Sequence, residues 1–259
     1  MKYDSWFDAD ENKALLAVCA RKLIRNIGIG GIIWGLINIG IGVIALEATL
    51  LNAGLVLLGL LMLGTGIQAL RSPTLGVLLS ETIVTILVFL WNLGISILNF
   101  QATNEFDPRG LIFPLIIAAA TFNYYRKLQH IREQISSVEP QRIKATQEIY
   151  KTLAKKKLKE DKSVVQTTDR KCRAMLMDGK AVFIQRDLMR AFAGSREDIR
   201  KSVVELEAKS LTLSFKHPLG PLKYKFDKHS SQKIRDWLSA PPASVAIGPG
   251  AAAEITPAL

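Results

Sequence analysis

The feature that most constrains this chain is a series of three long stretches without a charged residue. Residues 26–46 form an uncharged run of 21 residues, and residues 48–70 and 82–104 form runs of 23 each. A helix needs about 20 apolar residues to cross the hydrocarbon core of a bilayer. A fourth run, residues 110–125, has 16 residues and ends at aromatic and basic side chains that can lie in the interface. The sequence therefore predicts four membrane-spanning helices, at residues 26–46, 49–70, 75–99 and 109–127.

Charge is divided unevenly between the two halves of the chain. Residues 1–125 hold 7 Lys/Arg and 8 Asp/Glu, whereas residues 126–259 hold 27 and 15, a net charge of +12. Cytoplasmic flanks of membrane spans carry an excess of Lys and Arg. Here the N-terminal flank, the loop at Arg71 and the whole chain beyond Arg126 are basic, while the opposite loops contain only Arg109. We therefore expect both termini to be cytoplasmic, and we expect the protein to reside in the cell inner membrane.

These patterns predict an α-helical membrane protein with a helical stalk and a small cytoplasmic α+β domain. The first uncharged run is too long for the apolar region of a cleaved signal peptide, so we expect it to remain in the protein. The expected segments are a cytoplasmic N-terminal segment at 1–25, a four-helix bundle at 26–127, a basic helical stalk at 128–164, an α+β domain at 165–239 and a disordered tail at 240–259.

Small residues recur along one face of the first two predicted spans. In lipid, helices associate through close backbone approach and hydrogen bonds, so such faces are typical of helix contacts. We interpret them as packing seams in preference to a pore or ligand groove. The predicted packing residues are Gly28, Gly31, Gly35, Gly42, Gly59 and Gly66.

The third predicted span carries polar residues at helical spacing on one face. An ionisable residue within a span is a candidate for a proton or ion path. Glu81 lies near the predicted start of the span, however, where it could instead pair with Arg71 or Lys127, and we favour this structural role. The predicted polar stripe consists of Glu81, Thr85, Asn92, Ser96 and Asn99.

Residues 31–72, which read GIIWGLINIGIGVIALEATLLNAGLVLLGLLMLGTGIQALRS, form a Gly-spaced helix, a short turn and a second helix that ends in G-I-x-x-L. This stretch resembles the two-helix repeat of small multi-pass acid-resistance membrane proteins and covers about a sixth of the chain. The resemblance implies a tightly packed helical hairpin. Glu47, Ala48 and Thr49 replace the proline expected in the turn, and the resemblance assigns no functional residue.

The chain directly after the fourth predicted span is strongly basic. Between Arg126 and Lys162 there are 11 Lys/Arg and 5 Asp/Glu, on helices interrupted at Pro140. Juxtamembrane basic clusters are attracted to anionic lipid by about 1 kcal/mol per residue. The alternative is an ordinary positive flank that only sets topology. The candidate lipid-facing residues are Arg126, Lys127, Arg132, Lys155, Lys156, Lys157 and Lys159.

From Lys171 the pattern changes to alternation. Asp178 and Gly179 between two alternating stretches predict a β-hairpin with a type I′ turn. A second hairpin is predicted at 210–226, and Ser195 with Asp198 is typical of a helix start, although a strand there is an alternative. A final short helix starting at Ser230 or Ser231 should cover a sheet with its apolar face. This layout resembles the pleckstrin-homology-like superfold, which implies binding of lipid headgroups or protein partners rather than catalysis.

We find no catalytic motif, no expected cofactor and no metal-ligand spacing in the sequence. The two cysteines lie on the predicted cytoplasmic side, so no disulfide is expected. Our leading hypothesis is a non-enzymatic membrane protein whose bundle anchors a basic domain that binds protein partners or anionic lipid. The rival is a small transporter or channel that uses the Glu81 stripe, with the domain as regulator. We do not expect nucleic acid as a partner, and a homo-oligomer is compatible with either hypothesis. The residues 126–259 are expected to be soluble on their own.

Overall fold

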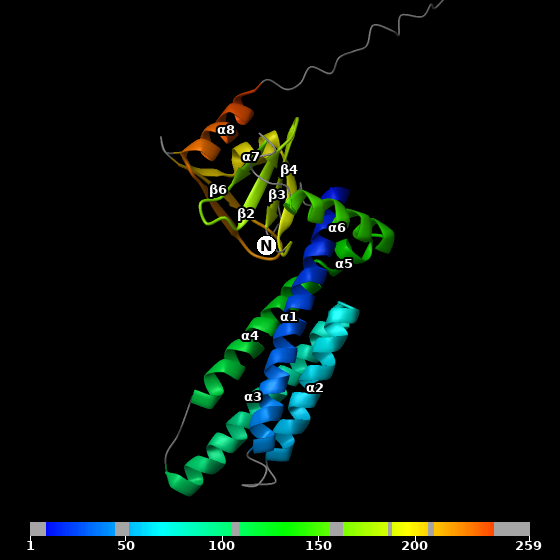
Figure 1. Cartoon of the computed structure of the whole chain (residues 1–259), viewed down its shortest axis with the longest axis vertical. Coiled ribbons are helices and arrows are strands. Elements are labelled where there is room, and N and C mark those ends of the chain that lie inside the picture. Colours follow the sequence, from blue (N-terminus) through cyan, green and yellow to red (C-terminus); the bar gives the residue numbers. More distant parts are fainter. Residues whose placement is uncertain are drawn as a thin grey trace, which may run out of the picture.

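The chain forms a helical bundle with a small α+β domain at one end (Figure 1). This arrangement comes from a computed structural model. The residues it describes are 9–44, 52–104, 109–155, 163–185, 188–206 and 210–240. The predicted tail beyond Ala240 lies outside the described residues, as do Lys156, Lys157 and Lys159 of the predicted basic cluster.

Four helices make up the bundle: α1 (Asp10–Ile44), α2 (Asn52–Arg71), α3 (Leu75–Thr103) and α4 (Arg109–His130). Among the described helices, α1, α2 and α3 are long and apolar enough to cross a membrane. This confirms the coarser prediction of membrane-type helices followed by a small β-sheet region. In α4 the uncharged run is only 16 residues, because Arg126 and Lys127 lie within its last turns.

The helix α1 is continuous over 35 residues. Residues 10–25, which we expected as a cytoplasmic segment before the first span, extend the same helix. Asp10 and Glu11 lie in its first turn, where negative charge complements the helix dipole. No proline occurs between Asp10 and Ile44 to interrupt it.

The turn between α2 and α3 is short and capped. Thr74 is the N-cap of α3, and its side chain accepts a hydrogen bond from the backbone N–H of Val77 at 3.3 Å. This capping explains why α3 starts at the predicted residue, Leu75. At the other end, Asn104 takes a left-handed conformation with φ of 61° and ends the helix.

The predicted stalk is folded back onto α1. Helix α5 (Arg132–Ser136) and helix α6 (Pro140–Lys155) follow α4, and Pro140 occupies the first position of α6, where its missing N–H costs nothing. Ile143 of α6 packs against Ala17 and Val18 of α1. The region is therefore a helical collar around α1 rather than an extended spacer.

The α+β domain contains two antiparallel sheets. The first has the order β1 (Val164–Gln166), β2 (Cys172–Leu176), β3 (Lys180–Gln185) and β4 (Ala191–Ser195). The second has the order β5 (Val203–Leu206), β6 (Leu211–Phe215) and β7 (Leu222–Phe226). An isolated bridge between Thr167 and Phe226 joins them.

Both predicted hairpins are present, as β2–β3 and β6–β7. The first turn is not type I′, however, since Gly179 has a φ of 74° whereas Asp178 is not among the residues with positive φ. Ser195 and Asp198 form the capping box of α7 (Arg196–Lys201), which ends early because β5 begins at Val203.

The core of the domain is aromatic and is closed by the last helix, α8 (Lys228–Ser239). Phe183 and Phe192 stack with ring centroids 4.9 Å apart, and Phe215 lies against both. Helix α8 begins two residues before the predicted start because Asp227 caps it, accepting a hydrogen bond from the N–H of Ser230 at 2.7 Å. Ile234 of α8 is buried in this core.

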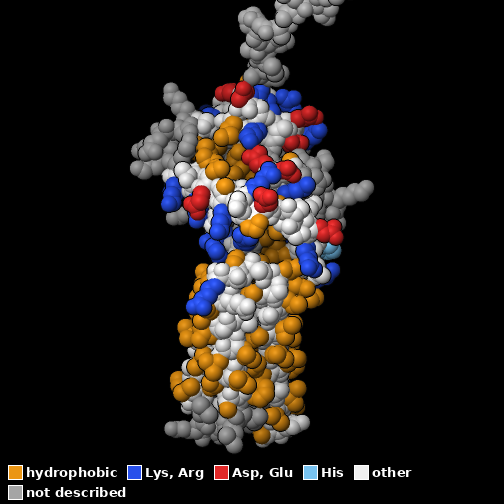
Figure 2. All heavy atoms as spheres, turned by 90° about the vertical axis from the view of Figure 1, so that its right-hand side faces the viewer, with side chains coloured by type: hydrophobic (Ala, Val, Ile, Leu, Met, Phe, Trp, Pro, Cys, Tyr) orange, Lys and Arg blue, Asp and Glu red, His pale blue; other side chains and the backbone are white. Residues whose placement is uncertain are grey.

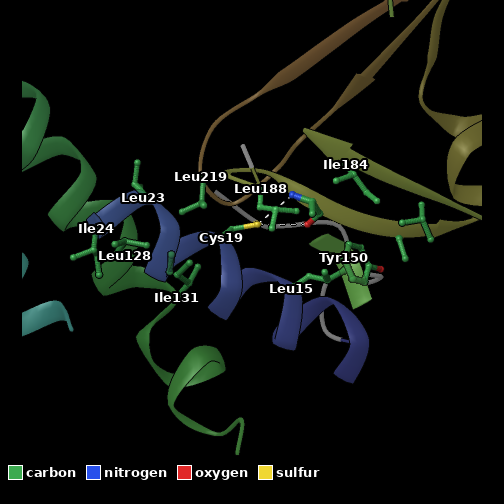
Figure 3. Packing of buried hydrophobic residues seen from close by; sticks show 14 of the residues in the cluster. Leu15, Cys19, Leu23, Ile24, Leu128, Ile131, Tyr150, Ile184, Leu188 and Leu219 are labelled. Carbon is green, nitrogen blue, oxygen red and sulfur yellow. Dashed lines mark hydrogen bonds between the residues drawn. The ribbon is translucent and has the colours of Figure 1, made fainter. Parts of the chain in front are cut away.

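Helix α1 lies along the edge strand β4 of the first sheet. Its side chains form hydrogen bonds with β4 and with Met189, which precedes β4. The N–H of Ala193 donates to Asn12 Oδ1 at 2.9 Å, and Asn12 Nδ2 donates to the Ala193 carbonyl at 2.8 Å. Seven residues further on, the N–H of Ala191 donates to Cys19 Sγ at 3.1 Å, as the dashed lines in Figure 3 show. After another seven residues, Asn26 Nδ2 donates to Met189 Sδ at 3.2 Å.

Apolar contacts reinforce this edge. In Figure 3, Leu15 and Cys19 point from α1 toward Ile184 and Leu188 of the sheet region, while Ile131 approaches from the collar. All five residues are buried. The N-terminal half of α1 is therefore part of the core of the α+β domain.

Candidate functional site

The small residues of α1 and α2 form a close helix contact. A β-carbon added to Gly35 would lie 2.7 Å from the carbonyl oxygen of Gly59, and one added to Gly28 would lie 2.8 Å from that of Gly66. Such distances leave no room for a side chain, so the two backbones touch directly. Gly42 continues the contact against Val56 near the start of α2.

Gly31 faces α3 instead of α2. A β-carbon on Gly31 would overlap the carboxylate of Glu81, so the glycine leaves the space that the Glu81 side chain fills. Thr65 of α2 donates a hydrogen bond to Glu81 Oε2, and Glu81 is only 2% exposed. Glu81 thus lies where α1, α2 and α3 meet.

The rest of the predicted polar stripe divides into a buried and an exposed part. Thr85 is buried and donates to the Glu81 carbonyl at 2.7 Å, while half-buried Asn92 donates to the Val88 carbonyl at 2.8 Å. Ser96 is half-buried and Asn99 is exposed. Thr85 and Asn92 therefore bond within α3, whereas Glu81 accepts a hydrogen bond from Thr65 of α2.

The reason for the division is the length of α3. Gly54, in the first turn of α2, lies against Trp91, so the last turns of α3 extend past the start of α2. Figure 1 shows this end of α3 diverging from α1 and α2. Asn99 consequently lacks the neighbouring helix that covers Glu81.

A crevice of about 310 Å³ adjoins Glu81 between α1 and α4. Its walls include Trp34 of α1, Met62 of α2 and Thr121 of α4, and they are mostly apolar. The Trp34 Nε1 atom is buried without a hydrogen-bond partner among the described residues. The crevice is therefore a mostly apolar hollow with the Glu81 and Trp34 side chains among its walls.

A second candidate site is the basic surface at the end of the bundle that adjoins the α+β domain. Figure 2 shows Lys and Arg side chains gathered where the hydrophobic surface of the helices ends. Arg126, Arg132 and Lys155 are exposed. Lys127 is half-buried, and its Nζ lies 5.6 Å from the centre of the Tyr124 ring, within the range of a cation–π contact.

Sequence reasoning used Arg21, Lys22 and Arg25 only as topology signals. In the structure they project from the stretch of α1 that contacts α6, and they line a hollow with Lys151. Their spacing at positions i, i+1 and i+4 on a helix is a signal that could have identified one shared cationic face.

The titratable groups inside the α+β domain are held in uncharged forms. Burial raises the pKa of the Cys172 thiol to about 12 and lowers that of His217 to about 3, with the Arg190 charge adding to the His217 effect. The N–H of Leu219 donates to His217 Nδ1 at 3.1 Å. No group of three His, Cys, Asp or Glu side chains suited to a metal ion occurs in the described part of the chain.

No protein-family model, curated protein or solved structure matches this chain.

Proposed function

We propose that the protein is a four-span membrane protein, with both termini cytoplasmic, that holds its α+β domain against the inner leaflet by binding anionic lipid headgroups. The surface of α4 supports the fourth span. Phe113 is 64% exposed, Ile116 58% and Ile112 51%. An apolar face of this size is unfavourable in water but not in lipid, where it needs no protein cover.

The single observation that carries the lipid-binding proposal is the set of cations at the end of the apolar surface (Figure 2). We call the described cations that flank the uncharged runs of α1 and α4 on this side the basic belt: Arg21, Lys22, Arg25, Arg126 and Arg132. None of these five cations makes a salt bridge within the described residues. Each cation near an anionic leaflet contributes about 1 kcal/mol of attraction.

The attachment of the domain to α1 supports a function at the membrane surface. Asn12 and Cys19 accept hydrogen bonds from the backbone N–H groups of Ala193 and Ala191, and these bonds fix β4 to the helix that enters the bilayer. The domain is thus held at one height and orientation above the leaflet. The arrangement favours recognition of lipid by the basic belt rather than by a freely tethered domain.

The test uses the full-length protein in nanodiscs of either phosphatidylcholine or phosphatidylglycerol. We expect slower amide hydrogen exchange over residues 126–136 in the anionic discs. The effect should weaken at high salt, since the Debye length falls from about 10 Å at 0.1 M to about 3 Å at 1 M.

The variant Arg126→Gln/Arg132→Gln should remove most of this protection. Lys228→Gln is the matched control, because Lys228 is exposed on α8, away from the bundle. Equal protection in both lipids would refute the proposal and would favour a protein partner for the domain.

The crevice at Glu81 supports a second candidate function, proton or ion translocation. A buried carboxylate in a membrane-level hollow is the expected feature of such a path. In proteoliposomes, Glu81→Gln should then abolish a proton- or cation-dependent flux that Ser80→Ala retains, since Ser80 is exposed on the same helix. If neither wild type nor variant moves ions, Glu81 is only a partner of Thr65.

A further inference from the structure

A polar hollow of about 390 Å³ lies between α1 and α6, beside Leu188. Arg21, Lys22 and Arg25 reach it from α1, and Lys151 reaches it from α6. Four of the seven described residues that line it are cationic, and none of the seven is acidic. The hollow is therefore a cavity with concentrated positive charge.

Among the described residues, little negative charge compensates the cations of the hollow. The sequence has no Asp or Glu between Lys13 and Glu47, so α1 offers no acidic neighbour on any face along this stretch. Lys151 pairs with Glu148 at 2.8 Å, but the Glu148 side chain is 71% exposed, so water screens this pair. Three like charges within about one turn of helix repel one another unless an anion lies among them.

A second observation points to a missing acceptor. The Nε atom of Arg25 is buried and has no hydrogen-bond partner among the described residues. A buried N–H group without an acceptor is unfavourable. A guanidinium can bind two oxygens of a phosphate side by side through planar, parallel hydrogen bonds, and the Nε–H is one of its donors.

The other lining groups complete a phosphate-type site. Lys22 and Lys151 supply compact ammonium charges, and the Gln147 side chain supplies an amide donor. Arg25 is also the last charged residue before the 21-residue uncharged run, so the hollow lies at the level of lipid headgroups.

We propose that this hollow is a discrete site for one phosphate-bearing anion per chain, with Arg25 as its central ligand. The anion is either the headgroup of a phospholipid or a soluble phosphate ester. The proposal deepens the proposed function and rests on it for the lipid source, because it adds a single saturable site to a diffuse basic belt.

The test uses the full-length protein in phosphatidylcholine nanodiscs that contain a minor fraction of phosphatidic acid. Native mass spectrometry should show one retained phosphatidic acid per chain. Arg25→Gln should weaken its apparent affinity about 10- to 100-fold, as expected for the loss of a charged hydrogen-bonded pair. Arg25→Lys keeps the charge but not the paired donors, and should give an intermediate loss.

Arg71→Gln is the matched control, since Arg71 is exposed at the cytoplasmic end of α2 and does not line the hollow. We expect it to change the affinity by no more than about twofold. Thermal unfolding without phosphatidic acid establishes that each variant is folded. An Arg25→Gln variant that is folded and binds like Arg71→Gln would overturn the proposal.

Glycerol 3-phosphate distinguishes the two sources of the anion. If it raises the unfolding temperature and displaces the retained lipid, the site takes a soluble phosphate ester. If the lipid stays bound, the site takes a headgroup. Retention of several lipids per chain without saturation would overturn the discrete site while leaving the basic belt intact. Loss of the anionic-lipid effect in the hydrogen-exchange experiment, with the Arg25 site still binding glycerol 3-phosphate, would instead refute only the belt.

Discussion

Asn12 of α1 and Ala193 of β4 exchange two hydrogen bonds, at 2.8 and 2.9 Å, across 181 residues of sequence. The amide side chain presents a donor and an acceptor in the arrangement that a neighbouring strand would present. A helix side chain therefore pairs the outward-facing backbone N–H and C=O groups of Ala193 at the edge of the four-stranded sheet. This contact protects β4 from pairing with another chain.

The first prediction follows from this pair. Asn12→Leu should lower the free energy of unfolding of the α+β domain by about 1–3 kcal/mol, because both backbone groups of Ala193 would be buried without a partner. Asn123→Leu is the control, since Asn123 is exposed on α4. Denaturant titration of the purified protein gives both values. A loss no larger than that of the control would mean that water replaces the amide.

The second prediction concerns the glycine contact between α1 and α2. Gly35→Ala should destabilise the bundle by about 1–3 kcal/mol, since its new methyl group would meet the Gly59 carbonyl and force the helices apart. Gly40→Ala on the same helix has open space around it and should be neutral or slightly stabilising. Thermal unfolding in detergent compares the two, and equal shifts would argue against close packing here.

The third prediction revises an expectation drawn from charge alone. Residues 126–259 are basic enough to be soluble, yet Leu15, Leu16 and Cys19 of α1 are buried against them. We expect the isolated fragment to unfold without a cooperative transition. A peptide of residues 9–25, added in trans, should restore the transition, whereas the same peptide with Leu15→Asp and Leu16→Asp should not. Cooperative unfolding of the fragment alone would contradict this expectation.

The fourth prediction tests the orientation of the bundle. Cys19 and Cys172 are both buried, so neither reports on topology by its failure to react. Exposed positions are needed: Thr103→Cys at the far end of α3 and Lys228→Cys on α8. An impermeant thiol reagent should label the first in intact cells and the second only after permeabilisation. The reverse pattern would place the α+β domain outside.

The fifth prediction concerns acid stability. The pKa of His217 is lowered from 6.5 to about 3 by burial, so the unfolded chain binds a proton more readily between these values. Stability from this group is therefore complete above pH 6.5 and decreases as the pH falls toward 3, by at most about 1.4 kcal/mol per pH unit. His217→Asn, which can still accept the Leu219 hydrogen bond, should flatten this part of the profile. An unchanged slope would assign the acid sensitivity to other groups.

The local features of the fold were predictable from the sequence, and their long-range contacts were not. Uncharged runs located the helices, Ser195 with Asp198 indicated a helix start, and the Asp178-Gly179 pair indicated a hairpin, because these signals act over a few residues. The bond from Thr65 to Glu81 depends on how two helices rotate against each other, which periodicity alone does not determine.

The connection between α1 and the sheet was missed for a similar reason. Asn12, Cys19 and Asn26 recur every seven residues, which indicates one helical face, but nothing in a single sequence identifies β4 as its partner. The cations Arg21, Lys22 and Arg25 were visible as charges. Their shared hollow depends on α6 folding back from Pro140, and the pattern indicated only a break there.

Because α1 is one continuous helix, it fixes the rotation of the α+β domain relative to the helical bundle. Each residue of an α-helix turns the chain by about 100°, so Asn26 and Gly28 point to nearly opposite sides of the same axis. One side meets the chain just before β4 and the other meets α2. A rotation of α1 against α2 must therefore turn the sheet by the same angle. A single residue inserted between Cys19 and Gly28 would rotate the face that contacts the sheet by about 100° relative to the face that contacts α2.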